Sequence, residues 1–380
     1  MADEPPSRRS CTPPDPAISE VRCRVYEVPT DQPEADGTLA WSSTTVVLVQ
    51  VVAGGTTGTG WTYASGGCRD VVANNLAAVM TGADPMDVPG ITESMVRACR
   101  NLGRPGLASC AVSAADTALW DLKARLLGQS LPGLFGRCRR DVPVYGSGGF
   151  TTYSDATTRT QLEGWIGELG IARVKIKVGQ SWGREPRRDL GRVALARSVV
   201  GEDVEVFVDA NGAYSAKQAI RIGERFAAEH SVTWFEEPVS SDDLAGLRQV
   251  RDQIAPDVAA GEYGYDETYF ARMIAAGAVD CLQVDVTRCG GYTCWLRAAA
   301  LAAAHGLQVS AHCAPARLAE VAGTVPNLRH VDYFHDHARL EAMLFDGVLT
   351  PVGGALLPEA SRPGHGYTLK EADAEPYRVA

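Results

Sequence analysis

The chain has 380 residues, of which 45% are hydrophobic and 22% are charged. This balance is typical of a folded globular protein and excludes disordered and fibrous classes for most of the chain. The 36 basic and 46 acidic residues give a net charge of −10, which argues against nucleic acid or an anionic membrane as the main partner. No apolar run approaches the roughly 18 residues of a membrane span.

The beginning of the chain and its cysteines point to a reducing compartment. Residues 1–18 are rich in proline and polar side chains, and we expect them to form a flexible tail without the apolar core of a secretion signal. The ten cysteines contain no CxxC pair, which favours free thiols over disulfides or a cysteine-bound metal. We therefore expect a cytoplasmic protein.

Residues 19–140 combine strand-like and helical patterns. The stretch 44–52 is rich in β-branched residues, and the glycine-rich segment 53–60 predicts the turn of a hairpin in an antiparallel sheet. Further along, 111–127 carries apolar residues at helical spacing and is followed by Gly128 as a stop signal. These patterns predict a small α+β domain.

Between residues 141 and 350, short strand-like runs alternate with amphipathic helical stretches. Eight such βα units in roughly 210 residues predict a parallel TIM-type barrel. A doubly wound sheet is the alternative, but its GxGxxG loop after the first strand has no good match here. The expected strands are 142–147, 173–178, 205–209, 233–237, 258–262, 282–286, 308–312 and 331–334.

Chemically distinctive residues close six consecutive strands of this pattern. Successive members are 23 to 32 residues apart, about one βα unit each, so a barrel places them at one mouth, where active sites of this fold lie. They are Lys177, Asp209, Glu236, Glu262, Asp285 and His312.

Three of the four carboxylates in this set stand on consecutive strands and are candidate metal ligands. Asp209, Glu236 and Glu262 would repel one another if left unpaired, and a divalent cation resolves the repulsion. An all-carboxylate set with room for water suits Mg²⁺.

The remaining residues supply bases. Lys175 and Lys177 share one face of a strand, where each ammonium should lower the pKa of the other and make a lysine base plausible near neutrality. His312 faces them, oriented by Asp285. The set predicts abstraction of the proton next to a carboxylate, with a metal and a lysine cation stabilising the enediolate.

Six ordered motifs make this chain resemble the enolase superfamily, specifically its mandelate racemase-like subgroup. Two further motifs resemble the family outside the barrel. The barrel motifs are Val-Lys-Ile-Lys-Val-Gly (174–179), Val-Asp-Ala-Asn-Gly (208–212), Phe-Glu-Glu-Pro (235–238), Ala-Gly-Glu (260–262), Gln-Val-Asp-Val-Thr-Arg-Cys-Gly-Gly (283–291) and Ser-Ala-His (310–312), and the others are Ala-Ala-Asp-Thr-Ala-Leu-Trp-Asp (114–121) and Arg-Pro-Gly-His-Gly-Tyr-Thr-Leu (362–369).

The resemblance implies a (β/α)₇β barrel over 141–350 and an α+β capping domain over 19–140. The C-terminal segment 351–380 would return to that domain. Loops near 26–41 and 54–63 would close over the mouth and select the substrate. Relatives of this kind assemble, so we expect a homo-oligomer, a multiple of a dimer such as an octamer.

The family's roles carry over residue by residue. Asp209, Glu236 and Glu262 look like the Mg²⁺ ligands, Lys177 like the base on one face, Lys175 like the cation on the substrate carboxylate, and His312 with Asp285 like the dyad on the other face. Twenty residues past the histidine, the racemase pattern has a substrate-binding glutamate.

This chain departs from that pattern, because the position holds Asp332, which is one methylene shorter. Its reach to the substrate is therefore open, with His335 as another candidate neighbour. Ser147 at the end of the first strand is a further candidate for substrate contact. His330, His335 and His337 could form a transition-metal cluster, but pocket lining or helix capping is the more ordinary reading.

Two reactions use these residues, and both act on a small carboxylate. The first is dehydration of an acid sugar to a 2-keto-3-deoxy acid, and the second is racemisation or epimerisation of a 2-hydroxy acid. Because Asp285 stands where the muconate cycloisomerase and dipeptide epimerase subgroup has a lysine, those chemistries are disfavoured. A non-catalytic binding or scaffold protein is the third hypothesis, and the intact six-residue set argues against it.

Overall fold

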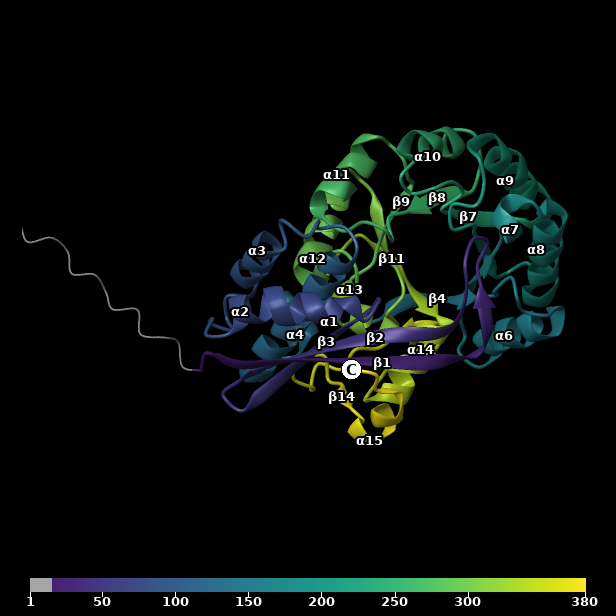
Figure 1. The fold of residues 1–380 in the computed structure, drawn as a ribbon. Coiled ribbons are helices and arrows are strands. Elements are labelled where there is room, and N and C mark those ends of the chain that lie inside the picture. Colours follow the sequence, from purple (N-terminus) through teal and green to yellow (C-terminus); the bar gives the residue numbers. More distant parts are fainter. Residues whose placement is uncertain (1–15) are drawn as a thin grey trace, which may run out of the picture.

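The computed structural model describes residues 16–380, so the expected tail at 1–18 lies almost wholly outside the described residues. The N-terminal domain is a three-stranded antiparallel sheet in the order β1-β2-β3 with helices packed against it (Figure 1). Its elements are β1 (Ile18–Ala35), β2 (Ala40–Ala53), β3 (Thr56–Tyr63), α1 (Gly67–Val71), η1 (Val72–Leu76), α2 (Ala77–Met80), α3 (Val88–Ala98), α4 (Leu107–Leu126) and α5 (Leu131–Phe135).

Helix α4 is the central element of this domain. It packs on β2 and β3, and its small side chains allow a close approach. Gly58 and Gly60 of β3 face it, and a Cβ at Gly60 would lie 2.3 Å from both the Ala114 carbonyl oxygen and Thr117 Oγ1. The helix was expected over 111–127 and begins one turn earlier.

Substituting Gly60 by valine should therefore destabilise the N-terminal domain. Overpacking at so tight a contact is expected to lower the free energy of unfolding by about 3 kcal/mol, because neither backbone can move away without breaking the packing. Urea unfolding would measure the change. Gly90→Ala in α3 is the matched control, since no atom lies within 4 Å of its added Cβ; an equal loss in both variants would contradict the packing argument.

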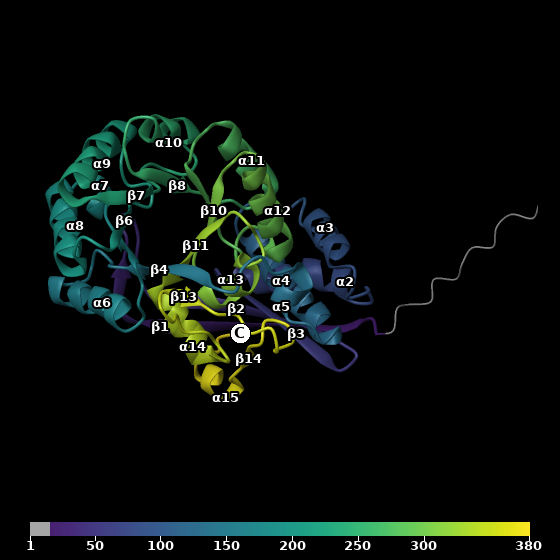
Figure 2. The same ribbon diagram turned by 180° about the vertical axis from the view of Figure 1, so that it is seen from behind.

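The second domain is a closed parallel barrel, as the alternation of strands and helices predicts (Figure 2). Its strands follow the order β4 to β11, and pairing between β11 and β4 closes the cylinder. The strands are β4 (Val142–Gly148), β5 (Arg173–Lys177), β6 (Glu205–Asp209), β7 (Val232–Glu236), β8 (Asp257–Ala260), β9 (Cys281–Val284), β10 (Gln308–Ala311) and β11 (Leu328–Phe334). The helices are α6 (Asp155–Gly167), α7 (Gln180–Gly183), α8 (Pro186–Val200), α9 (Ala216–His230), α10 (Leu244–Arg251), α11 (Glu267–Ala275), α12 (Gly291–Ala304), α13 (Pro315–Ala322) and α14 (His335–Leu344).

An aromatic layer fills the inside of the barrel beneath the mouth. Tyr145, Phe207 and Trp234 form a fully buried cluster, and His330 lies against all three rings. Each of these residues stands two positions before a predicted site residue, so the two sets share the inward face of their strands. The layer is a rigid floor for the polar side chains above it.

The two domains are joined at several buried points. Asp116 of α4 accepts a hydrogen bond from Thr293 Oγ1 of α12 at 2.5 Å. At the end of the chain, the amide of Val25 donates to the Ala380 carbonyl at 2.8 Å, so the C-terminus lies along β1. The remaining elements of this region are β12 (Phe345–Asp346), β13 (Ala355–Leu356), β14 (Thr368–Leu369), α15 (Glu371–Ala374) and η2 (Glu375–Tyr377).

We expected loops near 26–41 and 54–63. This expectation is wrong, because both segments are mostly strand. Residues 26–35 continue β1 and 56–63 form β3, while the Gly54–Gly55 turn is at the far end of the hairpin from Tyr63. Pairing with β2, interrupted by a register shift between Pro29 and Glu34, keeps both segments extended. The short turn 36–39 joins β1 to β2 next to the barrel mouth.

Among the described residues, none of the helices has the length and apolar character needed to cross a bilayer.

Candidate active site

The six strand-end residues meet at one mouth of the barrel. Lys177, Asp209 and Glu236 end β5, β6 and β7 and stand in register with one another. Asp285 and His312 follow directly after β9 and β10. All of the predicted strand-end residues are at most 5% exposed, so their charges are decided by one another rather than by water.

Glu262 reaches the mouth through an unusual backbone step. It follows Gly261, which has a φ of +133° and whose added Cβ would lie 2.2 Å from the Gln283 carbonyl oxygen, so only glycine fits there. Asn211, Glu237 and Cys313, which follow β6, β7 and β10, also have positive φ values of 45°, 38° and 50°. Such strained residues cluster at functional sites, and here they surround the same mouth.

Each of the three predicted metal ligands is paired with a cation in this structure. Lys177 Nζ lies 2.5 Å from Asp209 Oδ2, and Lys175 Nζ lies 2.5 Å from Glu236 Oε1. Glu262 Oε1 accepts from Arg288 at 3.0 Å. The carboxylates are thus neutralised by side chains that a bound cation could replace.

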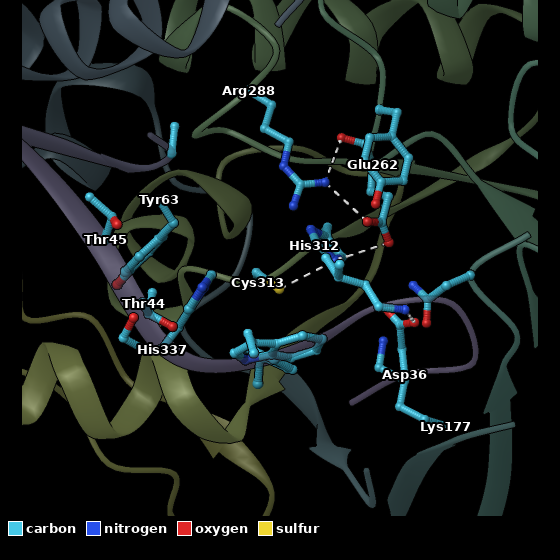
Figure 3. A pocket seen from close by; sticks show the side chains of 17 residues that line it. Asp36, Thr44, Thr45, Tyr63, Lys177, Glu262, Arg288, His312, Cys313 and His337 are labelled. Atoms are coloured by element: carbon cyan, nitrogen blue, oxygen red, sulfur yellow. Dashed lines mark hydrogen bonds and ion pairs between the residues drawn. The ribbon is translucent and has the colours of Figure 1, made fainter. Parts of the chain in front are cut away.

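The histidine dyad is formed between β9 and β10, and its His312 faces the cavity (Figure 3). His312 Nδ1 lies 2.9 Å from Asp285 Oδ2, and His312 Nε2 lies 3.2 Å from both Glu262 Oε2 and Cys313 Sγ. Asp285 Oδ1 also accepts from the Thr287 amide at 2.6 Å, which fixes the plane of the carboxylate. This arrangement leaves His312 Nε2 as the nitrogen that points toward the cavity.

Burial and neighbouring charges shift the pKa values of these groups. Burial lowers the pKa of Lys177, but attraction by Asp209, Glu262 and Glu236 together outweighs burial and raises the pKa above its ordinary value. Burial likewise opposes the charged form of His312, yet Cys313, Glu262 and the hydrogen bond to Asp285 raise its pKa well above the usual range. Lys175 does lower the pKa of Lys177, as expected, but the carboxylates outweigh this repulsion. The expected net result, a lysine with a lowered pKa, is therefore wrong for the chain without metal.

The residues fit a divalent cation. Glu236 and Glu262 each offer an oxygen within 4.8 Å of the other, and Asp209 stands beside Glu236 in register. Glu262 Oε2 is buried and has no hydrogen-bond partner, although it is in ionic contact with His312. Mg²⁺ prefers hard oxygen donors. This site offers three carboxylates, and one of them has an oxygen that accepts no hydrogen bond.

A cavity of about 280 Å³ opens above these groups between the two domains. Its floor comes from the barrel and includes Lys177, Glu262 and His312, and its roof comes from the N-terminal domain (Figure 3). The roof residues are Asp36, Leu39, Trp41, Ser43, Thr44, Thr45, Tyr63 and Ala64.

Three predicted substrate contacts lie away from this cavity. Lys175 is 1% exposed and is held beneath the mouth by Glu236 and by Asp332, whose Oδ2 accepts from its Nζ at 3.1 Å. Asp332 Oδ1 and Ser147 Oγ are buried without a hydrogen-bond partner. Among the described residues, none of these three lines the cavity, so substrate contact by them stays a prediction.

The three histidines of the C-terminal barrel region do not form one cluster. His330 lies in the aromatic floor and is bonded to Ser310, whereas His335 lies 2.9 Å from Asp31. His337 lines the cavity and stacks on Tyr63, with 3.5 Å between ring centroids. Because His337 Nδ1 accepts from the Ala314 amide and burial lowers its pKa, the ring is neutral with its proton on Nε2.

Sequence reasoning missed Arg288, whereas part of the roof lies in the segments 26–41 and 54–63 that were expected to cover the mouth. Arg288 stands over the ring of Tyr263 at 4.9 Å, pairs with Glu262 and lies 3.4 Å from Asp285, so it bridges the two halves of the mouth. Its place in the motif 283–291, three residues after Asp285, was the only available signal.

Comparison with known proteins gives this geometry a family. Residues 20–136 match the family model "Mandelate racemase / muconate lactonizing enzyme, N-terminal domain", and residues 157–373 match "Enolase C-terminal domain-like". The chain belongs to the mandelate racemase-like group of the enolase superfamily. It is therefore an enzyme.

Individual relatives agree with this assignment. The chain is 31% identical to 3,6-anhydro-alpha-L-galactonate cycloisomerase of Streptomyces coelicolor over 93% of this chain and 97% of the relative. It is 31% identical to L-talarate/galactarate dehydratase of Salmonella typhimurium over 79% of this chain and 73% of the relative. Further relatives include arabinonate, gluconate and rhamnonate dehydratases and a dipeptide epimerase.

Solved structures show the same fold. A mandelate racemase/muconate lactonizing enzyme-like protein from Rubrobacter xylanophilus is 48% identical, with a TM-score of 0.92 over 96% of this chain and 100% of that one. A racemase from Streptomyces coelicolor, solved with bound magnesium, is 30% identical, with a TM-score of 0.88 over 95% of this chain and 100% of that one.

Proposed function

We propose that this enzyme is a Mg²⁺-dependent acid sugar dehydratase that converts its substrate to a 2-keto-3-deoxy acid. The observation that carries the proposal is that Lys177 and His312 line one cavity beside Glu262. A base and an acid are therefore available to the same bound molecule. The lining also offers polar groups to a hydroxylated substrate, since Asn211 Oδ1 is buried without a hydrogen-bond partner and Thr45 adds a hydroxyl.

The chain's own residues divide the reaction into two proton transfers. Lys177 Nζ, once neutral, takes the proton from C2 of the substrate, and Asp209 beside it stabilises the ammonium that forms. His312 Nε2 then gives its proton to the C3 hydroxyl, which leaves as water. Mg²⁺ held by Asp209, Glu236 and Glu262 would supply positive charge for the enediolate oxygens.

Cycloisomerisation is a second candidate, because the cycloisomerase relative covers nearly all of both chains. In that reaction the same two residues would act on a cyclic sugar acid, and the leaving group would be a ring oxygen rather than water. Racemisation of a 2-hydroxy acid is the third, since Lys177 and His312 could exchange the C2 proton from two sides.

Proton NMR in D₂O with Mg²⁺ and a wide panel of sugar acids, lactones and 2-hydroxy acids separates the three. A dehydratase gives a new 3-deoxy methylene signal from an open acid, a cycloisomerase gives it from a cyclic one, and a racemase gives C2 exchange alone. In a dehydratase, His312→Asn should retain C2 exchange while elimination falls by about 10²-fold or more. Substrate turnover by His312→Asn equal to wild type would contradict the assigned acid.

Chelation should abolish turnover. Removing divalent cations with EDTA is expected to lower the rate below detection, because the enediolate charge is then opposed by three carboxylates, and added Mg²⁺ should restore it. Circular dichroism before and after chelation is the control for unfolding. Full activity in metal-free enzyme would contradict the proposal.

We also propose a cellular location and an oligomeric state for this enzyme. Every cysteine among residues 16–380 is a free thiol, which supports a reducing, cytoplasmic environment. We also propose a homo-oligomer, which light scattering would measure.

A further inference from the structure

A second cluster of metal-ligating side chains lies where the N-terminal domain meets the barrel. Asp31 and Glu34 come from the end of β1, and His335 begins α14. One nitrogen of the imidazole and one oxygen of each carboxylate lie within 4.8 Å of one another. The closest pair is His335 Nε2 and Asp31 Oδ2, at 2.9 Å.

Glu34 is the residue that shows the cluster to be incomplete. It is 0% exposed, its Oε2 accepts from Trp41 Nε1 at 2.8 Å, and its Oε1 is buried without a hydrogen-bond partner. Within residues 16–380, no lysine, arginine or histidine forms a salt bridge with it. A buried carboxylate is costly unless it takes up a proton or a cation. Burial, Asp336 and Asp31 raise the pKa of Glu34 to about 8, so a bound metal ion would displace this proton.

The other charged side chains near this cluster, Asp336 and Arg339, are paired with each other. Asp336 accepts two hydrogen bonds from Arg339 and one from Thr44 Oγ1 at 2.5 Å. The same guanidinium also donates to the Pro29 carbonyl at 2.8 Å. Arg339 is therefore engaged with Asp336, and Asp31, Glu34 and His335 are left as a set of their own.

We propose that Asp31, Glu34 and His335 bind a divalent transition-metal ion, zinc foremost, at a site separate from the catalytic Mg²⁺ site. Imidazole nitrogen and carboxylate oxygen are both zinc ligands, and the imidazole favours a transition-metal ion over Mg²⁺, which prefers oxygen alone. Zinc bonds of about 2.0–2.2 Å place tetrahedral ligands roughly 3.3 Å apart, so a small contraction of the present cluster suffices. A hollow of about 660 Å³ is lined in part by Asp31 and His335, so the cluster is open to solvent, which would supply a fourth ligand.

The site would fasten the edge of the active-site cavity. Asp36, Leu39 and Trp41 line the cavity and directly follow the two carboxylates along the chain. A metal that links β1 to α14 would hold this turn against the barrel. Binding should therefore reduce the motion of residues 29–41 without touching the reacting atoms.

Zinc retention in the presence of millimolar Mg²⁺ tests the site directly. The dialysed full-length enzyme is mixed with Zn²⁺, desalted and analysed for bound metal by mass spectrometry. We expect one equivalent in the wild type, its loss in Glu34→Gln and His335→Gln, and full retention in the exposed control His305→Gln. Glu262→Gln, which alters the catalytic site, should also retain the zinc.

The outcomes are distinct. The proposal would be overturned if the wild type bound no zinc, or if Glu34→Gln and His335→Gln bound as much zinc as the wild type. Loss of zinc in Glu262→Gln would place the ion at the catalytic site instead. Co²⁺ substitution adds a spectroscopic readout, since a d–d band that disappears in His335→Gln requires imidazole ligation. Hydrogen exchange of residues 29–41 should slow when zinc is added, and unchanged exchange would overturn the fastening role.

Discussion

Replacing Lys177 by methionine is expected to lower kcat/KM by about 10³-fold, equivalent to roughly 4 kcal/mol of transition-state stabilisation. Among the described residues, Lys177 is the one lysine that lines the cavity, and Lys175 is held beneath the mouth by Glu236 and Asp332. No second amine can therefore take over the C2 proton. The direct measurement is deuterium incorporation at C2 in D₂O, which should fall with the overall rate.

Folding has to be separated from chemistry in this experiment. Methionine at 177 leaves Asp209 without its 2.5 Å partner, so thermal unfolding should be measured with Mg²⁺ present. Lys177→Arg keeps the positive charge but cannot act as a base, and it should lose activity to a similar extent. The control is Lys217→Met on the exposed side of α9, which should keep wild-type activity. Retention of C2 exchange in both Lys177 variants would refute the assigned base.

The barrel and the six strand ends could be predicted because both follow from local pattern. Alternating short strands and helices admit few architectures, and the carboxyl ends of parallel strands share one mouth. All eight expected strands of the barrel are present, with bounds that differ by three residues at most. The metal-ligand candidates, Lys177 and His312 come together for the same reason.

The N-terminal hairpins could not be predicted in the same way. Residues 27–34 are rich in proline and acidic side chains, which by themselves are typical of a loop. Pairing with β2 keeps the segment extended, and the register shift between Pro29 and Glu34 accommodates the prolines. Long-range pairing overrides local propensity here, so the sequence did not show that the roof is built from strands or that Asp31 and Glu34 lie next to His335.

The sequence also could not show how deep each inward-facing side chain lies beneath the mouth. Lys175 and Lys177 lie two residues apart on one face of β5. Nevertheless, Lys175 forms a buried ion pair beneath the mouth, whereas Lys177 lines the cavity. The sequence shows which face a side chain takes but not which layer it occupies. That distinction decides whether Lys175 and Asp332 contact substrate directly or act by holding Glu236 in place.

Asp285→Asn is expected to lower kcat by about 10²- to 10³-fold. The carboxylate accepts from His312 Nδ1 at 2.9 Å and supports the imidazolium, whereas an amide can present its NH₂ group to that nitrogen and favour the wrong tautomer. Asp285 is a positioning residue in this scheme, because it acts on the substrate only through His312. Elimination should therefore suffer more than C2 exchange by Lys177.

The pH dependence distinguishes this role from a structural one. Burial disfavours the imidazolium, and Cys313, Glu262 and Asp285 together raise the pKa of His312. The acid must be protonated to act, so activity is lost as pH rises through this pKa. Removing the Asp285 charge lowers the pKa, and the alkaline limb of the kcat profile should move to lower pH. Asp257→Asn, at a half-exposed ion pair with Arg329 on the barrel surface, should leave that limb in place. An unmoved limb in Asp285→Asn would mean that His312 is not the acid whose titration limits the reaction.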